Sequence, residues 1–167
     1  MTLSIDLKID AGLWPDEAEL LGWLNAAVEA AQAELLAPLP PGEIAILLTD
    51  DQTMRAINRE HRGIDKPTNV LSFPTYPANI IPTLRADRPH LFGDLVFAEE
   101  TIASEALAAD RSRHHHMSHL IVHGFLHLLG YDHESDGEAE TMEALEKRVL
   151  CRLGIADPYS VGSEAGA

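Results

Sequence analysis

The sequence has little of several things, and each shortage excludes a class of protein. Its one cysteine, Cys151, rules out an intrachain disulfide and fits a reducing compartment, so we expect a cytoplasmic protein. No run reaches the ~18 consecutive apolar residues of a membrane-spanning helix, so we expect no membrane span. Asp6 and Asp10 stand where a secretory signal would be basic or apolar, so we expect no such signal.

Basic residues are also scarce, since 12 Lys and Arg stand against 27 Asp and Glu for a net charge of −15. This balance argues against nucleic-acid binding over the whole protein surface, because phosphate contacts use Lys and Arg. Residues 55–113, however, hold eight of the basic residues and eight acidic ones. We predict a local basic region formed by Arg55, Arg59, Arg62 and Lys66. For Arg55 and Arg59, ordinary ion pairs on a helix are an equal alternative.

Apolar residues make up 46% of the 167 residues, which is enough for the core of one domain. Alternation and short apolar runs predict strands at residues 3–9, 43–48, 69–73 and 93–97. Helical spacing predicts helices at residues 15–36, 49–59, 98–110, 112–129 and 136–153. Together they predict a single α+β domain with a mixed four-stranded sheet over residues 1–159, followed by a disordered tail at 160–167.

Three further expectations concern the core and one loop. Trp14 and Trp23 are predicted to anchor the core. Cys151 lies in an apolar helical pattern, so we predict a buried structural thiol rather than a nucleophile. Residues 74–91 contain four prolines and show no clear periodicity, so we expect a mobile loop that could cover a functional site.

Three histidines near the C-terminus carry the strongest chemical signal. His123 and His127 are four residues apart, which places both imidazoles on one face of a helix. Gly130 is suited to end that helix, because glycine enters the left-handed conformation without steric cost. The chain can then fold back and bring His133 to the same point. Three neutral imidazoles predict a site for Zn²⁺ with one open position, as in catalytic sites, although Ni²⁺, Co²⁺ and Fe²⁺ also accept imidazole.

The other histidines support this site less directly. A histidine-rich helix that only faces water or packs in the core is the simple alternative, but it does not explain the glycine and the third histidine. His115 and His119 are also four apart but have no returning residue, so we expect no second metal site. We expect residues 114–116 to be exposed, and His119 to pack against the metal ligands or hydrogen bond with them.

The histidine spacing matches the zinc-protease pattern His-Glu-x-x-His-x-x-Gly-x-x-His at every position but one. Gly124 stands where that pattern has its glutamate, which deprotonates the attacking water in those proteases. Glycine has no side chain for this step. The pattern therefore predicts a zincin-like scaffold and argues against peptide hydrolysis by that mechanism.

A second specific segment, residues 61–74, reads His-Arg-Gly-Ile-Asp-Lys-Pro-Thr-Asn-Val-Leu-Ser-Phe-Pro. Together with residues 92–96 (Phe-Gly-Asp-Leu-Val), residues 157–159 (Asp-Pro-Tyr) and the histidine motif, it resembles the YbeY family of bacterial endoribonucleases. The resemblance extends from about Leu47 to Tyr159. One departure is at residue 61, a histidine where the family often has an aromatic residue.

The resemblance implies a single-strand-specific, metal-dependent endoribonuclease. It implies a role in ribosomal RNA processing, at the 3′ end of the small-subunit RNA, and in ribosome quality control. The implied partners are single-stranded RNA and the small ribosomal subunit, with neither DNA nor a membrane. By motif match, the implied metal ligands are His123, His127 and His133, and the implied functional arginine is Arg62.

Several polar residues near these motifs are candidates for substrate contact. Arg62 would clamp a phosphate through its planar guanidinium, and a structural ion pair is its alternative. RNA backbone contacts could come from Lys66, Thr68, Asn69 and Ser72, but turn capping explains Thr68 and Asn69 equally well. The residues do not identify the general base. Activation of water by the metal ion could suffice, or Asp132 or Asp94 could help. These two carboxylates could instead orient a histidine or satisfy a turn.

Two other functions stay open from the residues alone. The protein could be a non-enzymatic ribosome-assembly or RNA-binding factor in which the metal ion only holds the fold. It could also be a hydrolase of another class on the same scaffold, although Gly124 argues against a peptidase.

Overall fold

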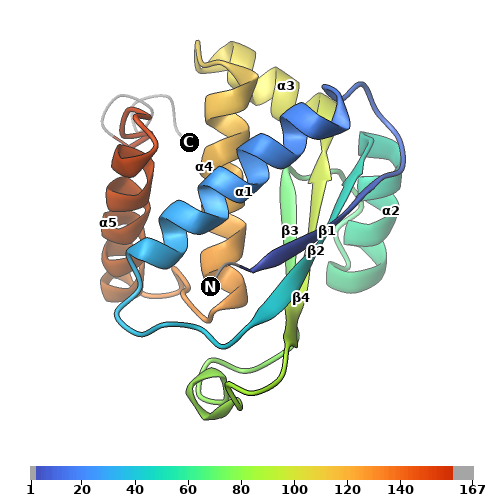
Figure 1. The fold of residues 1–167 in the computed structure, drawn as a ribbon. Helices are drawn as coiled ribbons and strands as arrows, with labels where there is room; N and C mark the ends of the chain where they lie inside the picture. The colour runs from blue at the N-terminus through green and yellow to red at the C-terminus, as the bar shows by residue number, and fades with distance from the viewer. Residues whose placement is uncertain (1–2, 160–167) are drawn as a thin grey trace.

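The computed structural model describes residues 3–159, which surround a four-stranded sheet (Figure 1). The strands follow the order β1-β2-β4-β3 across the sheet. β1, β2 and β4 are parallel, whereas β3 pairs with β4 in antiparallel fashion, so the mixed sheet is confirmed. The strand bounds are β1 Ser4–Ile9, β2 Gly42–Thr49, β3 Val70–Pro74 and β4 His90–Ala98.

Five α-helices lie where the sequence predicted them, with ends that differ by a few residues. Four of them begin after a side chain that accepts a backbone N–H of the first turn, which explains why their starts are defined locally. A short 3₁₀ helix, Ile81–Thr83, lies within the predicted loop. The helix bounds are α1 Glu17–Ala33, α2 Asp51–Arg62, α3 Glu99–Ala108, α4 Arg113–Leu128 and α5 Asp136–Arg152.

The helices cover the two faces of the sheet unequally (Figure 1). α1, α4 and α5 pack together on one face, where the main core forms. α2 covers the other face with a smaller apolar cluster around Met54 and Val96. Successive residues of β4 point to opposite faces, so Leu95 and Phe97 enter the main core while Val96 faces α2. This places α4, which carries the histidine pair, against β3 and β4.

Two expectations about this core have different outcomes. Trp14 and Trp23 are partly buried against the main core, which confirms that they are core contacts. The predicted burial of Cys151 is wrong, because its side chain is exposed. α5 turns Val149 and Leu150 inward, and the next residue along the helix points to solvent.

The remaining expectations concern the loop, membranes and the tail. β4 begins at His90, three residues before its predicted start, so it shortens the loop. None of the helices in residues 3–159 combines the length and the apolar character needed to cross a membrane. The predicted tail at residues 160–167 lies outside the described residues.

Candidate metal centre

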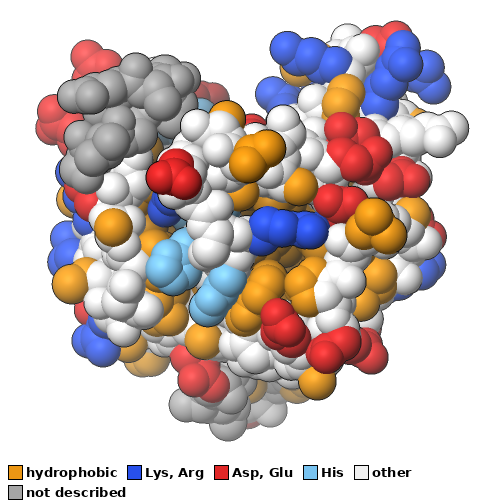
Figure 2. All heavy atoms as spheres, turned by 90° about the horizontal axis from the view of Figure 1, so that it is seen from above, with side chains coloured by type: hydrophobic (Ala, Val, Ile, Leu, Met, Phe, Trp, Pro, Cys, Tyr) orange, Lys and Arg blue, Asp and Glu red, His pale blue; other side chains and the backbone are white. Residues whose placement is uncertain are grey.

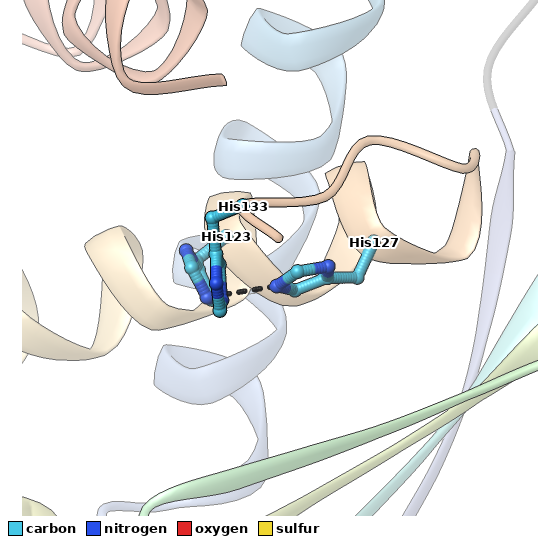
Figure 3. Close-up of side chains that lie close together, drawn as sticks. All are labelled: His123, His127 and His133. Carbon is cyan, nitrogen blue, oxygen red and sulfur yellow. Dashed lines mark hydrogen bonds between the residues drawn. The ribbon is translucent and has the colours of Figure 1, made fainter. Parts of the chain in front are cut away.

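The end of α4 brings the three predicted histidines together as the sequence suggested. His123 and His127 lie on the last turns of α4, and Gly130 follows its end with a φ of 98°. A Cβ at position 130 would lie 2.2 Å from the Cβ of Ala78, so this return has room only for glycine. The chain then turns back and places His133 beside the other two rings (Figure 3).

The geometry of the three rings suits a metal ion. The Nε2 atoms of His123 and His127 are 3.0 Å apart. The ring centroid of His133 lies 5.8 Å from that of His123 and 5.2 Å from that of His127. One ring nitrogen of each histidine lies within 4.8 Å of the other two. Three nitrogens this close can share a single ion.

Hydrogen bonds fix which nitrogens of the helical pair carry protons. The Nδ1 of His127 donates to the Tyr131 carbonyl at 2.9 Å, and the Nδ1 of His123 donates to the Glu146 carboxylate at 3.1 Å. Burial, followed by the neighbouring His123, lowers the pKa of His127 and favours its neutral form. With Nδ1 as the donor in both rings, the Nε2 atoms of His123 and His127 face each other, and a cation or a proton can lie between them. This donor set fits a metal ion.

Glu146 is the residue of this site that sequence reasoning missed. Its side chain is only 1% exposed, and it accepts hydrogen bonds from His123, from His119 at 2.8 Å and from Tyr159 at 2.9 Å. Burial works to raise the pKa of Glu146, but the bonds from His119 and His123 outweigh burial and bring the pKa to about 2. An ionised carboxylate therefore orients His123, with His119 in the supporting role that we expected.

A local signal could have revealed this glutamate. Position 146 lies on the apolar face of α5, next to Leu145 and near Met142 and Val149, all of which are buried. A carboxylate on a core-facing stripe is rare unless it has a partner. The nitrogens of His119 and His123 and an oxygen of Glu146 also lie within 4.8 Å of one another, but hydrogen bonds among them account for that proximity.

The histidines open into a cavity of about 1490 Å³. Figure 2, seen from above, shows a group of His side chains beside a Lys or Arg side chain on the upper face of the molecule. Arg62, the last residue of α2, lines the cavity, and no residue of the described chain forms an ion pair with it. Arg55 and Arg59 instead contact Asp65 at 2.8 and 3.8 Å, so the ion-pair alternative holds for them.

Comparison with known proteins agrees with this geometry. The family model described as "Endoribonuclease YbeY" matches residues 9–154. The chain belongs to the YbeY family. A relative named "Endoribonuclease YbeY" from Rhizobium meliloti (strain 1021) is 49% identical over 164 residues, covering 94% of this chain and 95% of the relative. One of the same name from Azorhizobium caulinodans is 48% identical, covering 97% and 99%.

The fold of the YbeY-family chain also has a counterpart among solved structures. It is similar to the solution structure of TM1509 from Thermotoga maritima, with a TM-score of 0.53 and 22% identity. The similarity covers 89% of this chain and 91% of that one. At this identity the likeness supports the α+β fold and nothing finer.

The structure separates the candidate contact residues of this YbeY-family chain into two groups. Asn69, Ser72 and Asp132 line the cavity, whereas Lys66 and Thr68 do not. Asn69 donates from its amide to Glu105 at 3.0 Å, and its side-chain oxygen accepts the N–H of Val70. The hydroxyl of Ser72 lies 3.4 Å from the Gly124 carbonyl oxygen, to which it donates. Asp132 accepts the His133 backbone N–H at 2.8 Å and so orients the return rather than a ring.

Two predictions about side-chain placement are wrong. Asp94 is exposed and lines a second hollow on the α2 side of the sheet, because the alternation of β4 sends Leu95 toward α4 and Asp94 away. It therefore cannot act as a general base beside the histidines. His116 is buried, not exposed, and bonds Glu105 at 2.9 Å, since it lies on the inward side of α4. His114 and His115 are exposed as expected.

Gly124 has a packing role that the comparison with zinc proteases did not suggest. A Cβ at position 124 would lie 2.9 Å from the Cδ2 of Leu95 and 3.4 Å from side-chain atoms of Val70 and Ser72. The position thus faces β3 and β4, and glycine lets α4 approach the sheet closely. A glutamate here would point into this packed layer.

Gly124→Glu is expected to lower the free energy of unfolding by about 3 kcal/mol, because it buries a carboxylate without a partner. Thermal unfolding followed by circular dichroism measures the loss. Gly124→Ala is the matched control: its gain in helix propensity of about 1 kcal/mol offsets a small shift of the Leu95 side chain, so it should melt near the wild type. Equal melting temperatures for the Glu variant and the wild type would contradict the packing role.

Proposed function

We propose that this chain is a metal-dependent endoribonuclease that cleaves single-stranded RNA, in particular at the 3′ end of small-subunit ribosomal RNA, and that it serves ribosome quality control. The observation that carries the proposal is one cavity lined by three converging imidazoles and by the guanidinium of Arg62, which has no ion pair within the described residues. A cation site next to a free guanidinium suits a phosphodiester. The names of the curated relatives support the same reading.

Each group has a separate chemical task in this proposal. His123, His127 and His133 would hold Zn²⁺, which suits a set of neutral imidazoles that leaves one position open. When bound, the ion would supply a Lewis acid and lower the pKa of a coordinated water. Arg62 would hold the phosphate by two parallel N–H bonds and stabilise the charge that develops during cleavage.

The cavity also favours unpaired RNA over a duplex. Aromatic side chains of Tyr76 and Tyr131 line it beside Pro74 and Pro77, and unpaired bases can stack on such surfaces. The acidic balance outside residues 55–113 offers little for a long duplex. The small ribosomal subunit as partner and a cytoplasmic location belong to this proposal.

The test uses protein whose metal content has been measured. It asks whether this protein cleaves an RNA that carries the 3′ end of small-subunit ribosomal RNA. The same RNA annealed to its complement and a DNA of the same sequence serve as comparison substrates. We expect cleavage of the single-stranded RNA alone. If none is cleaved while the protein still binds the single-stranded RNA, the assembly-factor alternative replaces this proposal.

Arg62→Ala is expected to lower kcat/KM for single-stranded RNA by about 10²- to 10³-fold, because the variant loses a donor to the transition state. Its melting temperature should stay that of the wild type, since the side chain is exposed and has no ion pair in residues 3–159. Arg59→Ala, on the same helix and outside the cavity, is the matched control and should cleave normally. Equal cleavage by all three proteins would remove Arg62 from the site.

A further inference from the structure

The arginines of residues 3–159 divide into two kinds. Seven of the nine form ion pairs, whereas Arg62 and Arg111 form none, and both line the histidine cavity. Lys8 and Lys66 also have no ion pair in this part of the chain, but neither lines the cavity. The paired arginines are Arg55 and Arg59 with Asp65, Arg85 and Arg88 with Asp87, Arg113 with Glu99, and Arg148 and Arg152 with Glu34.

Arg111 is held in place by the turn between α3 and α4. Asp110 adopts a left-handed φ of 53°, and the N–H of Arg111 donates to the Ala106 carbonyl at 2.9 Å, which closes the end of α3. The Arg111 side chain is partly buried, and burial lowers its pKa against the opposing effect of nearby Tyr159. A partly buried cation without a counter-charge is costly, so an anionic ligand would stabilise it.

The carboxylates of the cavity do not supply that counter-charge. Glu105 bonds His116 and Asn69, and Asp132 accepts the His133 N–H. Asp157 contacts Lys147 at 3.6 Å and accepts the N–H of Tyr159. Asp110 precedes Arg111 in the chain and forms no ion pair with it among the described contacts. Within residues 3–159, no carboxylate of the cavity therefore forms an ion pair with Arg111.

We infer that Arg111 binds a second phosphate of the RNA strand whose scissile phosphate lies at Arg62 and the histidines. The inference rests on the proposed function. α4 rises about 1.5 Å per residue, so the start of the helix lies roughly 15 Å from the turn that carries His123. Two phosphates that far apart belong to different nucleotides of one strand. A dinucleotide has a single internucleotide phosphate, so it cannot contact both Arg62 and Arg111.

The test compares two substrates, a single-stranded RNA decamer and a dinucleotide, with the metal-loaded full chain. For Arg111→Ala we expect the decamer KM to rise about ten-fold, and the preference for decamer over dinucleotide in kcat/KM to fall by a similar factor. The binding constant of a non-cleavable decamer is then measured at several salt concentrations. In Arg111→Ala the slope of log K against log [salt] should be less steep by about 0.7. Arg88→Ala, an exposed arginine outside the cavity, should change neither quantity.

Arg111→Lys separates charge from folding. It should keep the salt slope of the wild type while losing part of the decamer preference, because lysine retains the charge without the planar fork. The inference would be overturned if a folded Arg111→Ala had the salt slope and the decamer KM of the wild type. Equal losses in kcat/KM for the decamer and the dinucleotide would also overturn it. If Arg111→Ala unfolds, a Lys variant with a reduced salt slope overturns it instead. Absence of cleavage by the wild type would contradict the proposed function, and the binding measurement would then still decide the role of Arg111.

Discussion

His127→Ala should remove both the bound metal ion and RNA cleavage, with a loss in kcat/KM of about 10³-fold or more. Only two of the three converging imidazoles remain in this variant, so the ion loses a ligand. Several kcal/mol of transition-state stabilisation depend on such an ion, and each 1.36 kcal/mol is a factor of ten in rate. Elemental analysis of the purified variant and cleavage of single-stranded RNA measure the two losses.

His115→Ala is the control for this experiment, because His115 is exposed on the same helix and belongs to neither cluster of possible ligands among the described residues. It should retain both metal and activity. Full metal content in His127→Ala would show that the three histidines are not the metal site. A variant that loses cleavage only in proportion to its unfolded fraction would mean that the ion holds the fold rather than takes part in cleavage.

Glu146→Ala should lower the free energy of unfolding by about 3 kcal/mol. The substitution leaves buried donors on His119, His123 and Tyr159 without their acceptor. It should also weaken metal binding by about 10- to 100-fold, because the ring of His123 is no longer oriented. Urea denaturation without metal and a competition titration with a chelating dye measure the two effects separately.

Glu140→Ala on the same helix is the matched control, because that glutamate is exposed and should tolerate the change. The stability of Glu146→Gln should lie between those of Glu146→Ala and the wild type, since the glutamine amide retains one acceptor oxygen. A Glu146→Ala variant that is as stable as Glu140→Ala would mean that the buried hydrogen bonds contribute nothing net. Unchanged metal affinity would show that His123 is oriented by packing alone.

The parts of the molecule that were predictable from sequence are those that nearby residues decide. Helix starts at Asp50 and Ser112 follow from side chains that cap their own first turn. The histidine pair is also local, because four residues in a helix bring His123 and His127 onto one face. Gly130 then provides the return, and its left-handed φ is a property of its residue type.

The parts that escaped prediction depend on contacts between elements. The role of Glu146 follows from α5 packing against α4, which brings it to His123 across 23 positions of sequence. The exposure of Cys151 depends on where the apolar face of α5 ends, and a shift of one residue rotates a side chain by about 100°. Asp94 was misplaced for a similar reason, since a shift of one residue in a strand reverses the face.

The parallel pairing of β1, β2 and β4 has a consequence for how fast the molecule assembles. Ser4 pairs with Glu43 and Gly42 with His90, so each pairing closes a loop of about 40 residues or more before any contact compensates for the lost chain entropy. Such non-local topologies fold slowly compared with helical bundles of similar size. The two histidines of α4 lie on one face as soon as that helix forms, but the cavity beside them needs residues from distant parts of the chain to assemble around it.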